Sequence, residues 1–205
     1  NLAIEKQKVI QQLHDDGIWD MNHSLKLPVP LRRIAVISSP TAAGYGDFMD
    51  QLSKRDEYKF FTKLYPAIMQ GDEAPESIIC ALDAIYEEQE NFDAVVIIRG
   101  GGATTDLLAF DQYDLAACCA QFPLPIITGI GHERDNSVVD MVANSRCKTP
   151  TAVAEFIIKK MEETVQQLEE LTEALHEIIQ NCITQNRLRL KILASTLSLA
   201  TANRM

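Results

Sequence analysis

Short strand-like runs alternate with stretches of helical periodicity, and this alternation constrains the fold more than any other feature of the chain. We expect strands at Arg33–Ser38, Lys59–Tyr65, Asp93–Ile98 and Pro125–Gly129. Apart from the second, these are nearly continuous apolar runs, as in strands that are covered on both faces. Such strands with helices between them predict an α/β fold with a doubly wound, mostly parallel sheet.

The segments before and between these strands carry apolar residues at helical spacing. We expect a short lead-in helix at Leu2–Leu13 and further helices at Gly46–Lys54, Asp72–Gln89 and Asp111–Ala120. Pro28 and Pro30 mark a linker after the lead-in helix. The sequence therefore predicts a lead-in helix and linker over residues 1–30 and an α/β catalytic domain over residues 31–148.

The remaining residues, 149–205, have the pattern of a long helical arm. Thr149 suits the N-cap and Pro150 the first helical position. Apolar residues then recur every three or four positions among Glu and Gln, at Met161, Val165, Leu168, Leu171, Leu175, Ile178 and Cys182. So narrow a seam favours a coiled coil or a long packing helix, and we expect the arm to bind a partner.

Composition narrows the class of protein. With 46% hydrophobic and 23% charged residues the chain is an ordinary globular sequence, and no apolar run approaches the roughly 20 residues that span a bilayer. We expect a cytoplasmic protein with no membrane partner, whose five cysteines are reduced, because their number and spacing fit neither a disulfide framework nor a zinc site. A net charge of −10 argues against a chain that holds nucleic acid by itself.

Polar residues and glycines follow the carboxyl ends of three predicted strands. The first strand is followed by Ser39, Thr41 and Asp47, the third by Arg99, Gly100, Gly101, Gly102 and Asp106, and the fourth by His132, Glu133 and Asp135. Ligands of an open parallel sheet bind outside the carboxyl ends of its strands, so we expect these residues to gather in one crevice. If a helix begins near His132, then His132 and Asp135 share one of its faces.

These residue types suit the chemistry of a phosphoester. A guanidinium such as that of Arg99 grips two phosphate oxygens in a planar fork, and backbone N–H groups of a glycine-rich turn bind the others. His132 can give or take the proton at the leaving or attacking oxygen, while Asp135 or Asp47 orients the imidazole or the water. A dinucleotide site is a weaker alternative, because the triple glycine does not form G-x-G-x-x-G and follows the third strand.

Each feature taken alone also has a purely structural interpretation. The triple glycine can be a tight turn, and His132 can be a surface or capping residue. The carboxylates can be helix-start residues favoured by the helix dipole, and they are Asp47, Asp106, Glu133 and Asp135. Convergence on one edge of one sheet favours the functional interpretation.

Several short motifs stand in one order over roughly residues 5–160. They are Ile37-Ser38-Ser39-Pro40-Thr41 with Asp47, Tyr65-Pro66 with Gln70-Gly71-Asp72, Arg99-Gly100-Gly101-Gly102 with Asp106-Leu107, Gly131-His132-Glu133 with Asp135 and Asp140, and Thr149-Pro150-Thr151-Ala152 with Glu155. In this order they resemble the C-terminal nuclease region of the exodeoxyribonuclease VII large-subunit family. The chain departs from the family's usual residues at Ala42, Ala103-Thr104-Thr105, Arg134, Asn144 and Cys147.

The resemblance implies a nuclease that digests single-stranded DNA from both the 5' and 3' ends and releases oligonucleotides. It implies an assembly of one large subunit with several copies of a small subunit, which the helical arm carries. It also implies that an N-terminal OB-fold domain, a natural single-strand binder, is missing, so we expect this chain to be a piece of a longer protein. No metal is expected as a strict requirement, although Mg²⁺ stimulation is compatible with the resemblance.

The resemblance also implies roles for individual residues. The catalytic ones are Asp47, Arg99, His132 and Asp135. We expect Ser39, Thr41, Gly100, Gly101 and Gly102 to bind phosphate. We expect Glu133, Asp106 and Asp140 to hold these and the catalytic residues in place without contacting the substrate.

Two other functions stay open. One is a nucleotide- or sugar-phosphate-binding α/β enzyme or sensor that uses the same crevice, which predicts tight binding of a mononucleotide and no action on single strands. The other is a scaffold whose arm docks partners and whose sheet is catalytically idle.

Overall fold

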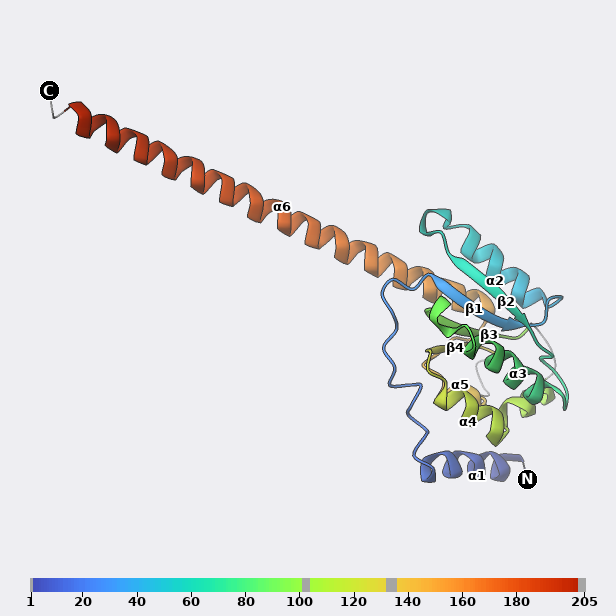
Figure 1. Cartoon of the computed structure of the whole chain (residues 1–205). Coiled ribbons are helices and arrows are strands. Elements are labelled where there is room, and N and C mark those ends of the chain that lie inside the picture. Colours follow the sequence, from blue (N-terminus) through green and yellow to red (C-terminus); the bar gives the residue numbers. More distant parts are fainter. Residues whose placement is uncertain (1, 101–103, 132–135, 203–205) are drawn as a thin grey trace. The chain divides into compact units, whose positions relative to one another are not determined.

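The computed structural model describes residues 2–100, 104–131 and 136–202, with side chains described in 2–100, 107–131 and 136–194. It divides into two compact units, one ending at Met161 and the other beginning at Glu162. The described strands all lie in the first unit and are β1 (Arg33–Ser38), β2 (Phe61–Pro66), β3 (Ala94–Ile98), β4 (Ile126–Gly129) and β5 (Ser145–Arg146). They form one sheet in the order β2-β1-β3-β4-β5, in which every pair is parallel (Figure 1).

This sheet confirms the predicted α/β fold. β1 has the predicted bounds, and β2, β3 and β4 begin one or two residues later than predicted. The sequence did not predict β5, because a strand of two polar residues has no apolar pattern to reveal it.

The helices before, between and after the strands also follow the prediction, with four short additions. The helices are α1 (Leu2–Asp15), α2 (Ala43–Ser53), α3 (Ala74–Tyr86), α4 (Tyr113–Gln121), α5 (Val138–Val142) and α6 (Pro150–Ala202), with short 3-10 helices η1 (Asp56–Tyr58), η2 (Gln89–Asn91) and η3 (Thr104–Asp111). The additions are α5 and the three 3-10 helices. After β4, the first described helix is α5, which begins at Val138, and the possible helix start near His132 lies outside the described residues.

Helices cover both faces of the sheet (Figure 1). α2 and the first turns of α6 pack on one face against Ile34 and Val36 of β1. α3, α4 and α5 pack on the other face against Ala35 and Ile37. All four of these β1 side chains are fully buried, so alternate residues of one strand enter two different cores. This double burial explains why the strand is a continuous apolar run in the sequence.

The first unit is larger than the predicted domain of residues 31–148. α1 lies against α4 and α5, and Leu13 near its end is fully buried in their core. At the other end Val153 and Ile157 of α6 are fully buried against the sheet. Residues before 31 and the first turns of the predicted arm therefore belong to the sheet domain, which extends to Met161.

A buried amide joins the segment after α1 to the sheet. Asn22 is fully buried, and its side-chain nitrogen donates to the carbonyl oxygens of Phe122 (3.0 Å) and Leu124 (2.9 Å). Its side-chain oxygen accepts from the backbone N–H groups of Ile126 (2.9 Å) and Asn144 (3.1 Å). Both donors and both acceptor sites of the amide are used. We call this set of five residues the Asn22 junction.

The second unit is the remainder of α6, which confirms the predicted long helical arm. Many of its apolar side chains are exposed, namely Leu168, Leu171, Leu175, Ile178, Ile179, Ile183, Leu188, Leu190, Ile192 and Leu193. They include four positions of the predicted seam; its pairing in a coiled coil stays a prediction. Across the described part of the chain, no helix has the long apolar stretch that crossing a lipid bilayer takes.

Candidate functional site

The chain leaves the neighbouring strands β1 and β3 toward opposite faces of the sheet. β1 leads into α2, which packs on one face, whereas β3 leads through η3 into α4, which packs on the other. Diverging connections of this kind open a crevice at the carboxyl ends of the two strands, where open α/β sheets bind their ligands. The sheet order therefore places a binding site beside Ser38 and Ile98, the last residues of these strands.

A cleft of about 800 Å³ lies at this position. It is formed by the loops after β1, β2 and β3 and by one residue of α3, and its lining consists of Ser39, Pro40, Thr41, Ala42, Ala43, Pro66, Ala67, Ile68, Met69, Gln70, Ser77, Arg99 and Gly100. Four of the predicted site residues are among them: Ser39, Thr41, Arg99 and Gly100. The structure thus brings together groups that are about 60 residues apart in the sequence.

Arg99 gives the cleft its charge. It is only 6% exposed, and among the described residues that line the cleft it is the one charged side chain. Its backbone N–H donates to the Gly129 carbonyl oxygen (3.3 Å), which ties the end of β3 to the end of β4. A guanidinium that is held at low exposure interacts with an anion more strongly than one in bulk water.

Hydroxyl groups surround the opening of the cleft. The Ser39 and Thr41 hydroxyl oxygens lie 3.3 Å apart at the exposed start of the loop after β1. Ser77 accepts a hydrogen bond from the Ile68 backbone N–H (2.9 Å), so it fastens the loop after β2 to α3. The sequence did not predict Ser77, Ile68 or Met69, because only the fold brings the loop after β2 to this edge.

The start of α2 approaches the Arg99–Gly100 backbone closely. A Cβ atom placed on Gly44 would lie 3.0 Å from the Arg99 carbonyl oxygen and 3.0 Å from the Gly100 Cα. A Cβ atom on Gly100 would in turn lie 3.1 Å from the Ala42 Cβ. Gly44 was not predicted as a site residue, although its lack of a side chain lets α2 approach the Arg99–Gly100 backbone this closely.

Asp47 lies outside the cleft lining. It sits on α2 one turn after Ala43, a lining residue, and its side chain is exposed. Residues four apart share a helix face, so Asp47 lies on the side of α2 that begins at the cleft.

Other predicted residues fall outside the described part of the chain. They are Gly101, Gly102, His132, Glu133 and Asp135, together with the side chain of Asp106 in η3. Their predicted roles stay predictions.

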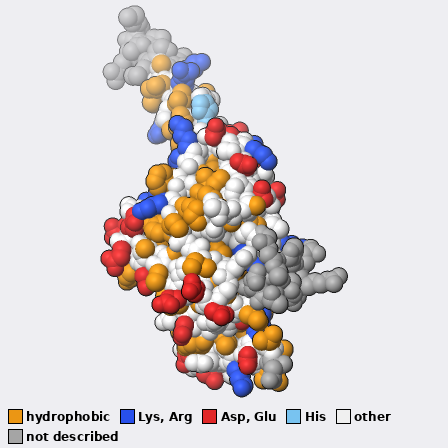
Figure 2. Space-filling view, turned by 90° about the vertical axis from the view of Figure 1, so that its right-hand side faces the viewer, with side chains coloured by type: hydrophobic (Ala, Val, Ile, Leu, Met, Phe, Trp, Pro, Cys, Tyr) orange, Lys and Arg blue, Asp and Glu red, His pale blue; other side chains and the backbone are white. Residues whose placement is uncertain are grey.

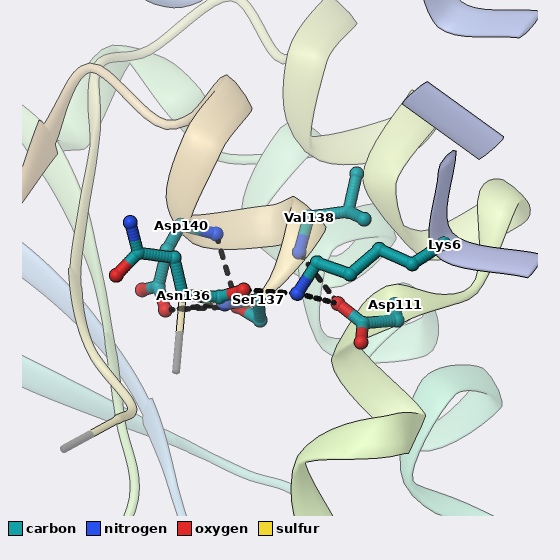
Figure 3. Close-up of polar contacts among 6 residues, drawn as sticks. All are labelled: Lys6, Asp111, Asn136, Ser137, Val138 and Asp140. Carbon is teal, nitrogen blue, oxygen red and sulfur yellow. Dashed lines mark hydrogen bonds and ion pairs between the residues drawn. The ribbon is translucent and has the colours of Figure 1, made fainter. Parts of the chain in front are cut away.

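Asp140 is buried and holds the start of α5. Its Oδ2 accepts from the Ser137 backbone N–H (3.1 Å), and the Ser137 hydroxyl oxygen accepts from the Asp140 N–H (3.1 Å), which together form a capping box (Figure 3). Its Oδ1 accepts from the Thr128 hydroxyl of β4 (2.6 Å). Asp140 does not line the cleft.

Near the cleft, one further side chain has a shifted pKa. Tyr65, just before the lining residue Pro66, has its pKa raised, chiefly by burial, so its hydroxyl stays protonated at neutral pH. Within the described ranges, no group of three or more His, Cys, Asp or Glu side chains is placed to hold a metal ion.

Comparison with known proteins gives one consistent result. The family described as exonuclease VII, large subunit, matches residues 18–205. The exodeoxyribonuclease 7 large subunit of Clostridium kluyveri is 34% identical over 96% of this chain and 48% of its own length. The proteins of the same name from Nostoc sp. and Brevibacillus brevis are 35% and 32% identical, over 95% and 99% of this chain and 47% and 43% of their own lengths. The chain thus spans about half the length of the curated relatives it matches.

Proposed function

The chain belongs to the exonuclease VII large-subunit family, and on that basis we propose that it forms the catalytic region of a nuclease that hydrolyses phosphodiester bonds of single-stranded DNA from both ends. The observation that carries the proposal is the position of Arg99, a cation of low exposure in a cleft at the β1–β3 switch point. Such a cation with hydroxyls beside it suits a phosphodiester.

In the proposed reaction Arg99 binds two non-bridging oxygens of the phosphodiester. The hydroxyls of Ser39 and Thr41 and the backbone N–H group of Gly100 bind the same phosphate. Pro40 and Met69 give the cleft an apolar wall, against which a deoxyribose or a base can lie without its identity being read. This arrangement suits a nuclease that acts on any sequence.

The proton transfers are assigned to residues other than those that bind the phosphate. Water attacks the phosphorus and gives up a proton, the bond from phosphorus to the leaving oxygen breaks, and the leaving oxygen takes a proton. His132 acts as general acid or base, and Asp135 and Asp47 orient the imidazole or the water. We propose that no divalent metal is strictly required and that Mg²⁺ at most stimulates the reaction. Complete loss of cleavage by the full assembly in excess chelator would contradict this.

Strand capture is proposed to need other parts of the assembly. The net charge of the chain is −10, and Figure 2 shows acidic side chains spread over the face in view with basic ones scattered among them. Phosphate neutralisation by Lys and Arg supplies most non-specific affinity for DNA. We therefore propose that several copies of a small subunit bind the exposed apolar residues of α6, such as Leu171 and Leu175, and that the assembly holds the strand.

The proposal is tested by Arg99→Lys in the complete assembly. Lysine keeps the charge but not the planar fork, so we expect cleavage of single-stranded DNA to fall by about 100- to 1000-fold. The matched control is Arg55→Lys, an exposed arginine paired with Glu57 (3.4 Å), which should cleave as the native protein does. If Arg99→Lys cleaves single-stranded DNA at the native rate, the proposal that the cleft binds the phosphodiester is wrong.

A small-molecule role is the second candidate, because the volume of the cleft is also that of a typical ligand pocket. It predicts that a mononucleotide binds the isolated chain tightly and that the assembly leaves single strands intact. Calorimetric titration with a mononucleotide, beside the cleavage assay, separates the two functions.

A further inference from the structure

A largely buried ion pair lies where α1, η3 and the start of α5 meet (Figure 3). The Lys6 ammonium of α1 lies 3.0 Å from Oδ1 of Asp111, and these side chains are 25% and 18% exposed. Lys6 also donates a hydrogen bond to the backbone carbonyl oxygen of Asn136. The same Asp111 Oδ1 accepts from the backbone N–H of Val138 (2.8 Å). One ammonium and one carboxylate thus fix two backbone groups at the entrance to α5.

Two of the three chain segments that carry the predicted catalytic residues lead to this ion pair. Asp111 ends η3, the element that follows the Arg99 loop. Asn136 comes directly after Asp135 in the sequence. The ion pair therefore joins the element that follows the Arg99 segment to the residue that follows Asp135.

The other contacts of α5 make this anchor effective. The capping box of Ser137 and Asp140 fixes the first turn of the helix, and the hydrogen bond from Thr128 to Asp140 holds that turn on β4. A displacement at Asn136 is therefore not absorbed by α5. Asn136 is therefore the point at which the ion pair sets the entry of the chain into α5.

We propose that Lys6 and Asp111 are positioning residues of the nuclease site, which set where the chain leaves the segment carrying His132 and Asp135. Neither residue lines the cleft, and the inference rests on the proposed function. The match to the family begins at residue 18, so α1 lies outside it. The inference therefore gives α1 a functional role that the family match does not contain.

The test uses Lys6→Met and Lys6→Arg in the complete assembly. Methionine keeps much of the apolar stem beside Leu2 and Leu107, next to a cavity of about 190 Å³, and removes the ammonium. We expect kcat on single-stranded DNA to fall by about 10- to 100-fold with little change in KM, because misplaced groups slow the chemical step and leave strand binding intact. Lys6→Arg should restore most of kcat, since a guanidinium also donates to both Asp111 and Asn136.

Lys63→Met is the matched control. It breaks the exposed ion pair with Glu88 (2.6 Å) elsewhere in the first unit, and kcat should not change. A native kcat for Lys6→Met overturns the proposal. The proposal is also overturned if kcat falls only in proportion to the fraction of unfolded protein and Lys6→Arg shows the same fall. Amide hydrogen exchange at Val138 is the readout independent of activity: it should speed up in Lys6→Met, and unchanged exchange also overturns the proposal. Failure of the proposed function itself would show as no cleavage of single-stranded DNA by the native assembly, or as native cleavage by Arg99→Lys.

Discussion

The Asn22 junction and the cleft both gather polar groups from distant parts of the chain, but these groups make different numbers of protein contacts. In the junction one fully buried amide makes four hydrogen bonds to the protein. In the cleft the Ser39 and Thr41 hydroxyls are exposed and lie at the edge of hydrogen-bond distance from each other (3.3 Å). Polar groups whose bonding capacity is used inside the protein hold the fold, because a buried group without a partner is costly. Exposed groups keep that capacity for a ligand.

Asn22→Ala tests the junction and should have the largest effect on stability. It removes four hydrogen bonds and leaves buried backbone groups without partners, so we expect the free energy of unfolding to fall by about 3 kcal/mol or more. Urea denaturation monitored by circular dichroism measures the change. Ser24→Ala is the control, because its exposed hydroxyl donates only to the Met21 carbonyl oxygen (2.9 Å), and it should cost less than about 0.5 kcal/mol. Equal effects of the two variants would contradict the comparison.

Gly44→Ala tests how tightly the cleft wall is built. Its new methyl group would meet the Arg99 and Gly100 backbone and lie 2.8 Å from Pro150 Cγ, so we expect a loss of about 2 kcal/mol and reduced cleavage. The control is Gly46→Ala on the same helix, where no atom of the described residues lies within 4 Å of the added atom. That change should raise stability by about 0.5 to 1 kcal/mol through helix propensity. If Gly44→Ala stabilises the protein, the Arg99–Gly100 backbone and Pro150 can shift to make room for the methyl group, which contradicts the expectation.

Asp93 extends the comparison to the amino edge of the sheet. Burial alone would raise its pKa, but hydrogen bonds from the Arg33 side chain and from the backbone N–H groups of Arg33 and Arg32 outweigh burial, so its pKa lies below the usual value. A lowered folded-state pKa stabilises the protein above the unfolded-state pKa of about 3.9, and this stabilisation is lost as the pH falls through the folded-state pKa. At pH 7 we expect Asp93→Asn to be less stable by about 1 to 2 kcal/mol.

Denaturation at several pH values checks this expectation. The difference between the native chain and Asp93→Asn should be constant from neutral pH down to about pH 4 and shrink below it. A difference that grows as the pH falls would mean that the sign of the pKa shift is wrong.

The double variant Ser39→Ala with Thr41→Val should have the smallest effect on stability. Both hydroxyls are exposed and their mutual contact is long, so we expect the free energy of unfolding to change by less than about 0.5 kcal/mol. Cleavage by the assembly should nevertheless fall by about tenfold or more, because two phosphate donors are lost. Stability loss comparable with that of Asn22→Ala would remove the distinction between junction and cleft.

The sequence predicted the parts of the fold that leave a local pattern. β1 and β3 are apolar runs because both of their faces are buried, and α3 keeps helical spacing because only one of its faces is. The Asn22 junction has no local pattern, since it joins residues 100 to 122 positions apart. The residues before 31 were therefore predicted as a lead-in helix and a linker outside the sheet domain, and only the structure shows that they pack against it.

The same distinction applies to the candidate site. The rule that ligands bind at the carboxyl ends of strands was enough to group Ser39, Thr41, Arg99 and Gly100. It could not show that the Asp47 side chain is exposed or that Gly44 touches the Arg99 loop, because both depend on how α2 packs.

Asn144 shows a different limit of sequence comparison. By sequence, Asn144 is one of the departures from the residues usual in the family that the chain resembles. Its side-chain nitrogen instead donates to the carbonyl oxygens of Asn22 (3.1 Å) and Leu25 (2.6 Å), which an ionised carboxylate cannot do. The substitution therefore belongs to the junction.

The two edges of the sheet bear on how the protein avoids aggregation. A free edge strand offers unpaired backbone groups to any other chain, and native proteins limit this with short edges and charged side chains. Here β5 is two residues long, and β2 ends at Pro66 and exposes Lys63. Neither edge is a good template for an added strand, so the sheet is protected from polymerisation during folding. Of the surfaces described, this leaves helices as the better suited to bind other subunits.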